Sequence, residues 1–489
     1  GDLTAGVEFH EHIGPAEGKG DKTIAGGGIH GRRGFRAAVM RRKGMRQARD
    51  RAADLVARAI KAGADAADAI YVAEASTGVQ VRLGALEDVQ RSEGEEIGLR
   101  VFVGKQSASA SSSDLSADAM AKLAERAVAM AGQAPEDEYA GLAPQDRLMT
   151  GAPADYDIDD GGEVSPQDLR DRAMRAEDAA RAIKGVTNSE GGSASAGRAL
   201  IALATSGGFA GSYAGSSHGV SASVLAGEGS DMQRDYSWHS TRHLGDLDDA
   251  AKIGREAGER AVARLNPVRL KSGPMPVIFD PRVAGSIIGH LIGAITGAAI
   301  ARKTSFLLDA LDTEVFGSGI TIVDDPHRMR GLRSKPFDGE GLPTERRAII
   351  DQGRLTTWLL DSASARQLGL RPTGHASRGV SGPPGAGATN LHMEPGSLSP
   401  VDLMADIMEG FYVTDLIGQG VNGLTGDYSR GASGFVIRNG QIEGPVAEVT
   451  IAGNLKDMFR NLTPANDLEF RHGTNAPTLR LEGMTLAGD

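Results

Sequence analysis

The feature that most constrains the fold is an uncharged segment, residues 283–301, in which glycine recurs at every fourth position. Gly285, Gly289, Gly293 and Gly297 would lie on one face of a helix. Each glycine inside a helix costs about 1 kcal/mol relative to alanine. We therefore expect one buried helix whose glycine face is compensated by the close approach of a neighbouring backbone.

A membrane span is the competing interpretation of this segment. Small residues at this spacing occur in membrane helices, and the segment nearly reaches the ~20 residues that cross a bilayer. Trp and Tyr are missing from both ends, however, and Arg282 and Arg302 lie at opposite ends rather than in one basic flank. We favour a buried helix in a soluble protein, in which His290 is a hydrogen-bonded core residue rather than a metal ligand.

Composition excludes several kinds of chemistry. The chain has 489 residues, enough for two to four structural units, and it contains 67 glycines and no cysteine. Without cysteine there is no disulfide, no thiol nucleophile and no iron–sulfur cluster. The net charge is −11 and no Lys/Arg cluster lies beside aromatic residues, which argues against nucleic-acid binding. No signal-peptide pattern opens the chain, so we expect a cytoplasmic protein without a membrane span.

Composition and periodicity divide the chain into an α+β lobe in two units and a strand-rich lobe. The boundaries are a glycine-rich leader at 1–44, expected to be disordered, an α+β unit at 45–133, an acidic linker at 134–164, a second α+β unit at 165–267, and a strand-rich domain at 271–489. We expect helices and antiparallel strands in the N-terminal lobe. The C-terminal lobe is expected to be barrel-like and to hold the glycine-rich helix.

Short signals locate individual elements. A helix with an apolar face is predicted to begin at Met45, and Ser116 and Ser165 are predicted N-caps of two further helices. Asn439-Gly440, between two strand-like runs, is a strong hairpin signal.

The histidines suggest two weak metal candidates. His239 and His243 have the i, i+4 spacing of metalloprotease helices, but Ser240 stands where those helices carry glutamate, and the surroundings resemble a strand or loop. His10 and His12 lie in the leader. We expect neither pair to bind a metal.

Two further patterns have structural explanations. Residues 215–219 match G-x-S-x-G, but the residues that follow alternate like a strand, whereas a nucleophile elbow needs a helix there. Asp324, Asp325, Asp338 and Glu340 could bind a hard cation, yet acids beside Gly and Pro commonly stabilise turns. Residue patterns alone therefore assemble no catalytic constellation.

Several segments together resemble a known family. The chain is similar to the PmbA/TldE branch of the TldD/PmbA metallopeptidase family from about residue 68 to its C-terminal end. The segments that carry the resemblance occur in family order at 95–104, 276–281, 289–297, 303–307, 337–343 and 425–429, followed by Asn439-Gly440.

The resemblance implies a two-lobed α+β fold and a heteromer with a TldD-like catalytic subunit that holds zinc. Such complexes are expected to cleave peptides or unfolded polypeptides in the cytoplasm, or to mature a peptide precursor. An older label for the family is modulator of DNA gyrase. A homodimer is expected when the chain is alone.

The chain departs from the catalytic branch at the metal motif. The TldD sister carries H-E-x-x-x-H on the corresponding helix and a C-terminal cysteine as third ligand. Anchored on Thr304, the two histidine positions fall near Ile288 and Gly293, and the glutamate position falls at Gly289. Residues 471–477 occupy the region of the missing cysteine. The resemblance therefore implies a non-catalytic partner.

We accordingly assign no catalytic, cofactor-binding or metal-ligating residue to this chain, and we expect zinc only in a TldD-like partner. The alternative function is a self-associating peptide-binding or scaffold protein that acts without a protease.

Overall fold

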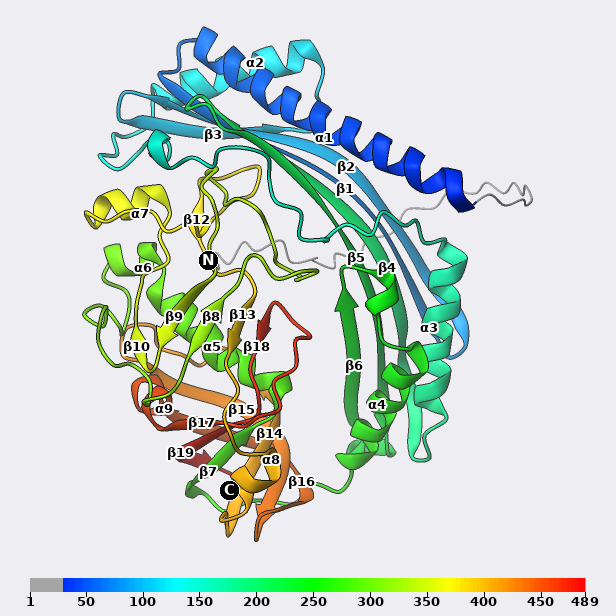
Figure 1. The fold of residues 1–489 in the computed structure, drawn as a ribbon. Coiled ribbons are helices and arrows are strands. Elements are labelled where there is room, and N and C mark those ends of the chain that lie inside the picture. The colour runs from blue at the N-terminus through cyan, green and yellow to red at the C-terminus, as the bar shows by residue number, and fades with distance from the viewer. Residues whose placement is uncertain (1–29, 489) are drawn as a thin grey trace.

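The computed structural model describes residues 30–488, which fold into two lobes (Figure 1). The N-terminal lobe is built on one six-stranded antiparallel sheet in the order β3-β2-β1-β4-β5-β6. Its strands are β1 (Ala66–Arg82), β2 (Ala85–Val103), β3 (Gln106–Ser112), β4 (Val186–Thr205), β5 (Ala210–Ala226) and β6 (Gln233–Thr241). The two predicted α+β units thus contribute three strands each to one shared sheet.

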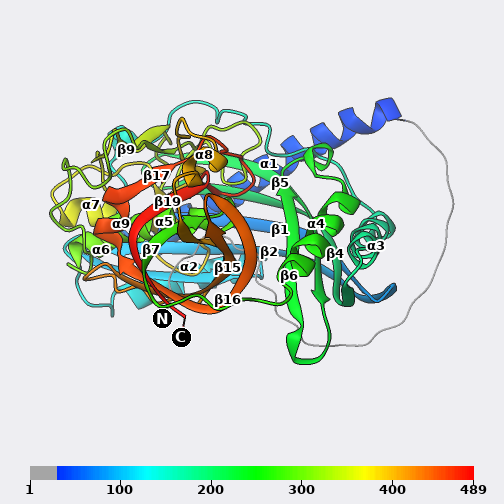
Figure 2. The ribbon, with the colours of Figure 1, turned by 90° about the horizontal axis from the view of Figure 1, so that it is seen from below.

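Four helices cover the face of this sheet that points away from the C-terminal lobe (Figures 1 and 2). They are α1 (His30–Lys61), α2 (Ala117–Ala131), α3 (Pro166–Arg181) and α4 (Ala250–Ala263), and short 3₁₀ turns lie at η1 (Gln145–Arg147), η2 (Gly229–Asp231) and η3 (Leu244–Asp246). Ser116 caps α2 and Ser165 caps α3, as predicted. The predicted start of the first helix at Met45 is wrong, because α1 begins at His30.

The strands of the N-terminal lobe are longer than their sequence signals. Strands β4 and β5 continue through Gly-, Ser- and Ala-rich stretches that have low strand propensity. Each of these strands forms backbone hydrogen bonds with a neighbouring strand on both sides, and these bonds outweigh the low strand propensity of the residues. The result is the long, curved sheet that wraps around the C-terminal lobe in Figure 1.

The C-terminal lobe contains a closed barrel of five strands, because β16 pairs with both β15 and β19. The barrel strands are β7 (Gly273–Phe279), β14 (Glu409–Ile417), β15 (Asp427–Arg438), β16 (Gln441–Asn454) and β19 (Leu479–Ala487), and β17 (Leu462–Pro464) pairs with β19. Asn439 and Gly440 adopt φ angles of 47° and 75° between β15 and β16, as the hairpin signal predicted. The mixed fold with a barrel-like strand-rich lobe confirms the predicted α+β class.

A second sheet and five short helices complete this lobe. The sheet has the order β10-β9-β8-β13-β18, and a separate pair, β11–β12, lies nearby. The bounds of these strands are β8 (Ile322–Asp324), β9 (Arg347–Asp351), β10 (Arg354–Leu355), β11 (Ala376–Ser377), β12 (Gly385–Ala386), β13 (Leu391–Met393) and β18 (Thr474–Asn475). The helices are α5 (Pro281–Ile295), α6 (Gly297–Ala301), α7 (Ser362–Gln367), α8 (Pro400–Met404) and α9 (Leu455–Asn461).

The predicted single helix over 283–301 is in fact two helices. Thr296 has extended backbone angles (φ −65°, ψ 140°) and forms a bridge with Leu359, which ends α5 at Ile295. The Thr296 hydroxyl then accepts a hydrogen bond from the amide of Ala299 and caps α6. Within residues 30–488, no helix combines the length and the apolar character needed to cross a membrane.

A buried ionic cluster joins the two lobes. The Asp68 carboxylate on β1 accepts hydrogen bonds from Arg100 on β2 and from Arg378 in the C-terminal lobe. Glu340, also in the C-terminal lobe, lies 3.6 Å from Arg100 and accepts the amide and hydroxyl of Ser362. All four charged side chains are buried. The pKa of Asp68 is lowered because the attraction of the two guanidinium groups outweighs the effect of burial.

We predict that Asp68→Asn destabilises the protein by about 3–5 kcal/mol, because it leaves Arg100 and Arg378 buried without their shared carboxylate. Urea unfolding measures the change. The control Asp50→Asn removes an exposed carboxylate 3.7 Å from Arg46 and should change stability by less than about 1 kcal/mol. Equal effects of the two variants would contradict a structural role for the cluster.

The Glu340 carboxyl gives the cluster a pH dependence. Burial raises its pKa from 4.5 to about 7 despite the nearby Arg100. Between these values the folded protein holds a proton that the unfolded chain has lost. The stabilisation is therefore complete below about pH 4.5 and is lost as the pH rises towards 7.

We predict that Glu340→Gln makes the change in the free energy of unfolding between about pH 5 and pH 7 more positive, because it removes the contribution of Glu340 that falls as the pH rises. Asp338, whose pKa burial also raises, contributes in the same direction and leaves a residual slope. Urea titrations across this range check the prediction, with Glu345→Gln at an exposed position as the control. An unchanged slope in Glu340→Gln would contradict it.

Candidate functional site

The open face of α5, formed by Gly289 and Gly293, is the starting point of the candidate site. Asp280 caps the helix through the amide of Arg282, and Ile287, Ile288 and Leu291 are fully buried against the barrel. Gly289 and Gly293 are exposed on the other side. The helix therefore presents bare backbone to solvent along part of its length.

The glycines of α5 and α6 differ in what surrounds them. A Cβ at Gly297 would lie 2.2 Å from Ser364 Oγ, and one at Gly285 would lie 3.2 Å from the carbonyl oxygen of Thr474. A Cβ at Gly289 or Gly293 would have no such neighbour within 4 Å. The predicted close packing is thus correct for Gly285 and Gly297 and wrong for Gly289 and Gly293, where the face is open.

A polar group converges beside the open face of α5. The His290 ring meets the Tyr428 ring edge to face with centroids 5.8 Å apart, and Tyr428 and Arg430 lie two residues apart on the same side of β15. His290 Nε2 and Arg430 Nε are buried atoms without a hydrogen-bond partner among the described residues, and the buried Tyr428 Oη has no partner there apart from the neighbouring Arg430. His290 is therefore not the fully hydrogen-bonded core histidine that the sequence predicted.

Burial and charge set the ionisation of this group. Burial lowers the pKa of His290 to about 4, and the charge of Arg430 acts in the same direction. Burial raises the pKa of Tyr428 to about 12, although Arg430 opposes this shift. At neutral pH the imidazole and the phenol are uncharged, so the group carries the single positive charge of Arg430.

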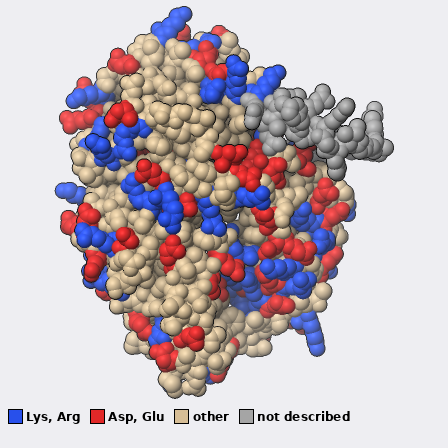
Figure 3. Space-filling model, in the orientation of Figure 1, with Lys and Arg blue, Asp and Glu red and all other residues tan. Residues whose placement is uncertain are grey.

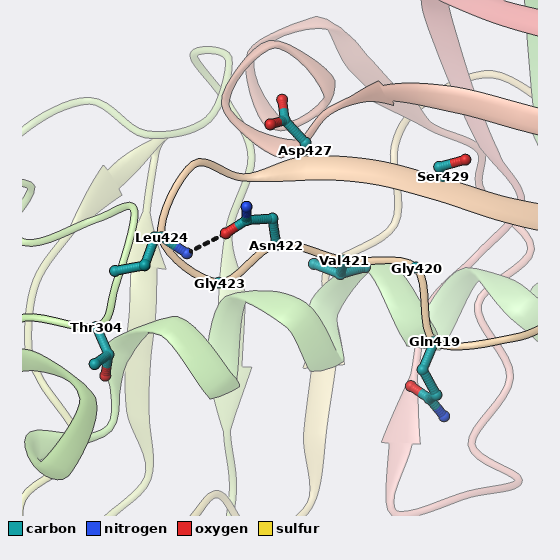
Figure 4. A pocket seen from close by; sticks show the side chains of 9 residues that line it. All are labelled: Thr304, Gln419, Gly420, Val421, Asn422, Gly423, Leu424, Asp427 and Ser429. Carbon is teal, nitrogen blue, oxygen red and sulfur yellow. Dashed lines mark hydrogen bonds between the residues drawn. The ribbon is translucent and has the colours of Figure 1, made fainter.

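A cavity of about 700 Å³ lies at the loop that connects β14 to β15. The loop is fixed at both sides, because Ser429 donates to the Gly420 carbonyl over 2.7 Å and Phe306 donates to the Gly423 carbonyl over 2.8 Å. In Figure 4 the loop curves around the cavity, with Thr304 on the side opposite Asp427.

The C-terminal segment 471–477 lies between α5 and the sheet of the N-terminal lobe. Thr474 approaches Gly285, and the His472 ring contacts the Trp238 ring of β6 with centroids 4.6 Å apart. Trp238 is 40% exposed, and burial lowers the pKa of His472 to about 4. The region predicted to replace the missing cysteine thus connects the open face of α5 to the edge of the large sheet.

The residues beside α5 do not fit a zinc ion. A protein zinc site needs three or four His, Cys, Asp or Glu ligands. No group of three or more such residues is placed to hold a metal within the part of the chain that the structure describes. The single histidine of α5, His290, lies near the positive charge of Arg430, which repels a cation.

The structure shows where the predicted first position of the metal motif lies on α5. Ile288 is fully buried in the core, so a ligand at 288 would point away from the open face. The same spacing begun at Gly285 gives Gly285, Ser286 and His290, none of which is fully buried. Of these three residues, only His290 is of a type that binds zinc.

The other candidate residues have structural roles. His239 lies on β6, where its Nδ1 accepts the amide of Asp248, and His243 lies beyond the strand, 2.8 Å from the carbonyl of Asp157. Residues 215–219 lie in the middle of β5, as the alternation predicted. His10 and His12 lie outside the described residues.

The four acidic candidates are engaged in turns and in the contact between lobes. Asp338 accepts three backbone amides, Asp324 accepts the amide and hydroxyl of Thr389, and Asp325 accepts the amide of His327. Together with the contacts of Glu340, this pattern agrees with the structural interpretation of these acids. The convergence of His290, Tyr428 and Arg430 left no sequence signal, because it joins residues far apart in the chain.

Solved structures place the chain in a class of two-lobed α+β proteins with this curved sheet and barrel. A protein from Bacteroides thetaiotaomicron that carries the name modulator of DNA gyrase matches with a TM-score of 0.83 and 27% identity, over 90% of this chain and 98% of that one. TldE from Thermococcus kodakarensis shares the fold with a TM-score of 0.80 and 22% identity, over 89% of this chain and 99% of that one.

The chain belongs to the PmbA/TldA metallopeptidase family, on its PmbA/TldE side. Its family models match domain 1 at residues 67–131, the central domain at 159–265 and the C-terminal domain at 272–488. Metalloprotease PmbA of Escherichia coli O157:H7 is 40% identical over 89% of this chain and 96% of its own length. A PmbA homolog of Haemophilus influenzae is 37% identical over 88% of this chain and 94% of its own.

We predict that Gly289→Ala and Gly293→Ala each stabilise the isolated protein by about 0.5–1 kcal/mol, because alanine is the better helix former and meets no neighbour. Gly297→Ala should destabilise it, because the new methyl group would collide with Ser364. Thermal unfolding of the three variants checks this order. Destabilisation by Gly293→Ala would show that the face is covered in solution.

Proposed function

We propose that this chain is the non-catalytic subunit of a two-component zinc peptidase that acts in the cytoplasm. A TldD-like partner would hold the zinc ion and carry out hydrolysis, whereas this chain would complete the substrate chamber and position the peptide. The observation that carries the proposal is the open face of α5, which bears glycine and a lone histidine beside Arg430 where a metal motif would stand.

The position of the large sheet supports peptide binding near this face. β6 is the last strand of the sheet and pairs only with β5 among the described strands, so no described strand covers its outer edge. A peptide can add to such an edge as a further strand. Trp238 of β6, His472 and Thr474 then lead from this edge to Gly285, which lies on α5 four residues before Gly289 of the open face.

The alternative is a self-associating peptide-binding or scaffold protein that works without a protease. The same sheet edge and the cavity beside the 419–424 loop would serve that function. On the face of the molecule in Figure 3, acidic and basic side chains are interspersed. Such a mixed surface is compatible with either kind of protein partner.

We expect the purified chain to contain no stoichiometric zinc and to cleave no unfolded polypeptide by itself. Adding the TldD-like chain of the same organism should produce proteolysis that a chelator abolishes. Metal analysis and cleavage of fluorescent casein measure the two results. The matched control is a partner whose H-E-x-x-x-H glutamate is changed to glutamine, which should remain inactive in the complex.

Chelator-sensitive cleavage by this chain alone would overturn the proposal. A partner whose activity does not depend on this chain would favour the scaffold alternative. Gentle isolation from the native cell extract separates the two further, since only the peptidase subunit should co-purify with a chain that carries the metal motif.

A further inference from the structure

Buried polar atoms beside α5 that lack a hydrogen-bond partner indicate a place where a ligand can bind. Buried polar atoms in folded proteins almost always have a hydrogen-bond partner. His290 Nε2 and Arg430 Nε have none among the described residues, and the hydroxyl of Tyr428, which is only 1% exposed, has no partner there apart from the neighbouring Arg430. The three side chains are neighbours, since the His290 and Tyr428 rings are in contact and Arg430 affects the pKa of both.

The chemistry of these atoms selects the ligand. Arginine can only donate hydrogen bonds, the tyrosine hydroxyl can donate, and a neutral imidazole donates from the nitrogen that carries its proton. Three potential donors around one fixed positive charge match an acceptor with a single negative charge. A metal cation is disfavoured by Arg430, whereas a carboxylate matches both the charge and the donors.

The open face of α5 lies next to these side chains and is accessible from solvent. Gly289 and Gly293 flank His290 along the helix and are exposed, and no atom occupies the space where their side chains would lie. His290 and Arg430 are themselves only partly buried. A larger residue at either glycine position would cover part of the surface next to His290.

We infer that His290, Tyr428 and Arg430 form a subsite that binds a carboxylate of a peptide. This inference rests on the proposed function in so far as the peptide is its substrate. The carboxylate could be the C-terminal group of the peptide or the side chain of an internal Asp or Glu. Either would accept hydrogen bonds from Arg430 and Tyr428 and would be aligned beside the open face of α5.

Binding to the full chain alone tests the inference without a partner or a cleavage assay. The probes are three fluorescein-labelled Ala/Ser peptides of equal length. The first has a free C-terminal carboxylate and no acidic residue, the second is amidated with an internal Glu, and the third is amidated with Gln in its place. Fluorescence anisotropy should show at least one of the carboxylate peptides binding about tenfold more tightly than the Gln amide.

Variants identify the residues responsible. Arg430→Gln should remove the preference for carboxylate, and Tyr428→Phe should reduce it several-fold, with both variants checked for an unchanged melting temperature. The matched control is Arg438→Gln, an exposed arginine on the same strand that faces Glu443 at 3.4 Å and should leave the preference unchanged. If the peptide with the free C-terminus binds more tightly, the site recognises a C-terminal carboxylate. If the peptide with internal Glu binds more tightly, the site recognises an acidic side chain.

Equal binding of all three peptides, or no binding of any, would overturn the inference and leave water as the partner of the buried atoms. A carboxylate preference that survives in Arg430→Gln would overturn the assignment to this site. Failure of the proposed function appears differently, since a chain that needs no protease partner could still discriminate carboxylate from amide.

Discussion

The buried contact of Asp68 with Arg100 and Arg378 fixes the position of the two lobes, and the candidate site depends on that position. Asp68 and Arg100 belong to the large sheet, whereas Arg378 and Glu340 belong to the C-terminal lobe. A buried carboxylate between two arginines is stable only while all partners stay in place. The cluster therefore limits sliding of one lobe over the other.

Close backbone packing reinforces this ionic contact. A Cβ at Gly98 on β2 would lie 1.9 Å from the carbonyl oxygen of Val380, so only glycine allows the C-terminal lobe to approach the sheet there. Ile70, Phe209 and Phe337 form an apolar cluster across the same junction. The edge of β6 and the open face of α5 are thereby held in a constant relation, which a site that aligns an extended peptide requires.

Much of the architecture could be predicted from the sequence, and the remainder depended on long-range contacts. Capping serines, the Asn439-Gly440 turn and the two-lobed α+β class follow from local chemistry or from the resemblance, and the structure contains them. The break at Thr296 could not be predicted, because it depends on a bridge to Leu359 across the lobe. The open surroundings of Gly289 and Gly293 were hidden for the same reason, since spacing along a helix does not show what lies opposite it.

The closure of the barrel by β19 has a consequence for the order of folding. β7, which begins at Gly273, pairs with β14 on one side and with β19 on the other. Because β19 begins only at Leu479, β7 cannot form its second pairing until almost the whole chain has been made. The sheet of the N-terminal lobe is complete by Thr241, so during synthesis this lobe can form while the barrel is still open. Its inner face then stays uncovered until nearly the whole C-terminal lobe has emerged from the ribosome. The newborn chain is thus most exposed to aggregation and chaperone capture in the interval before its last strand arrives.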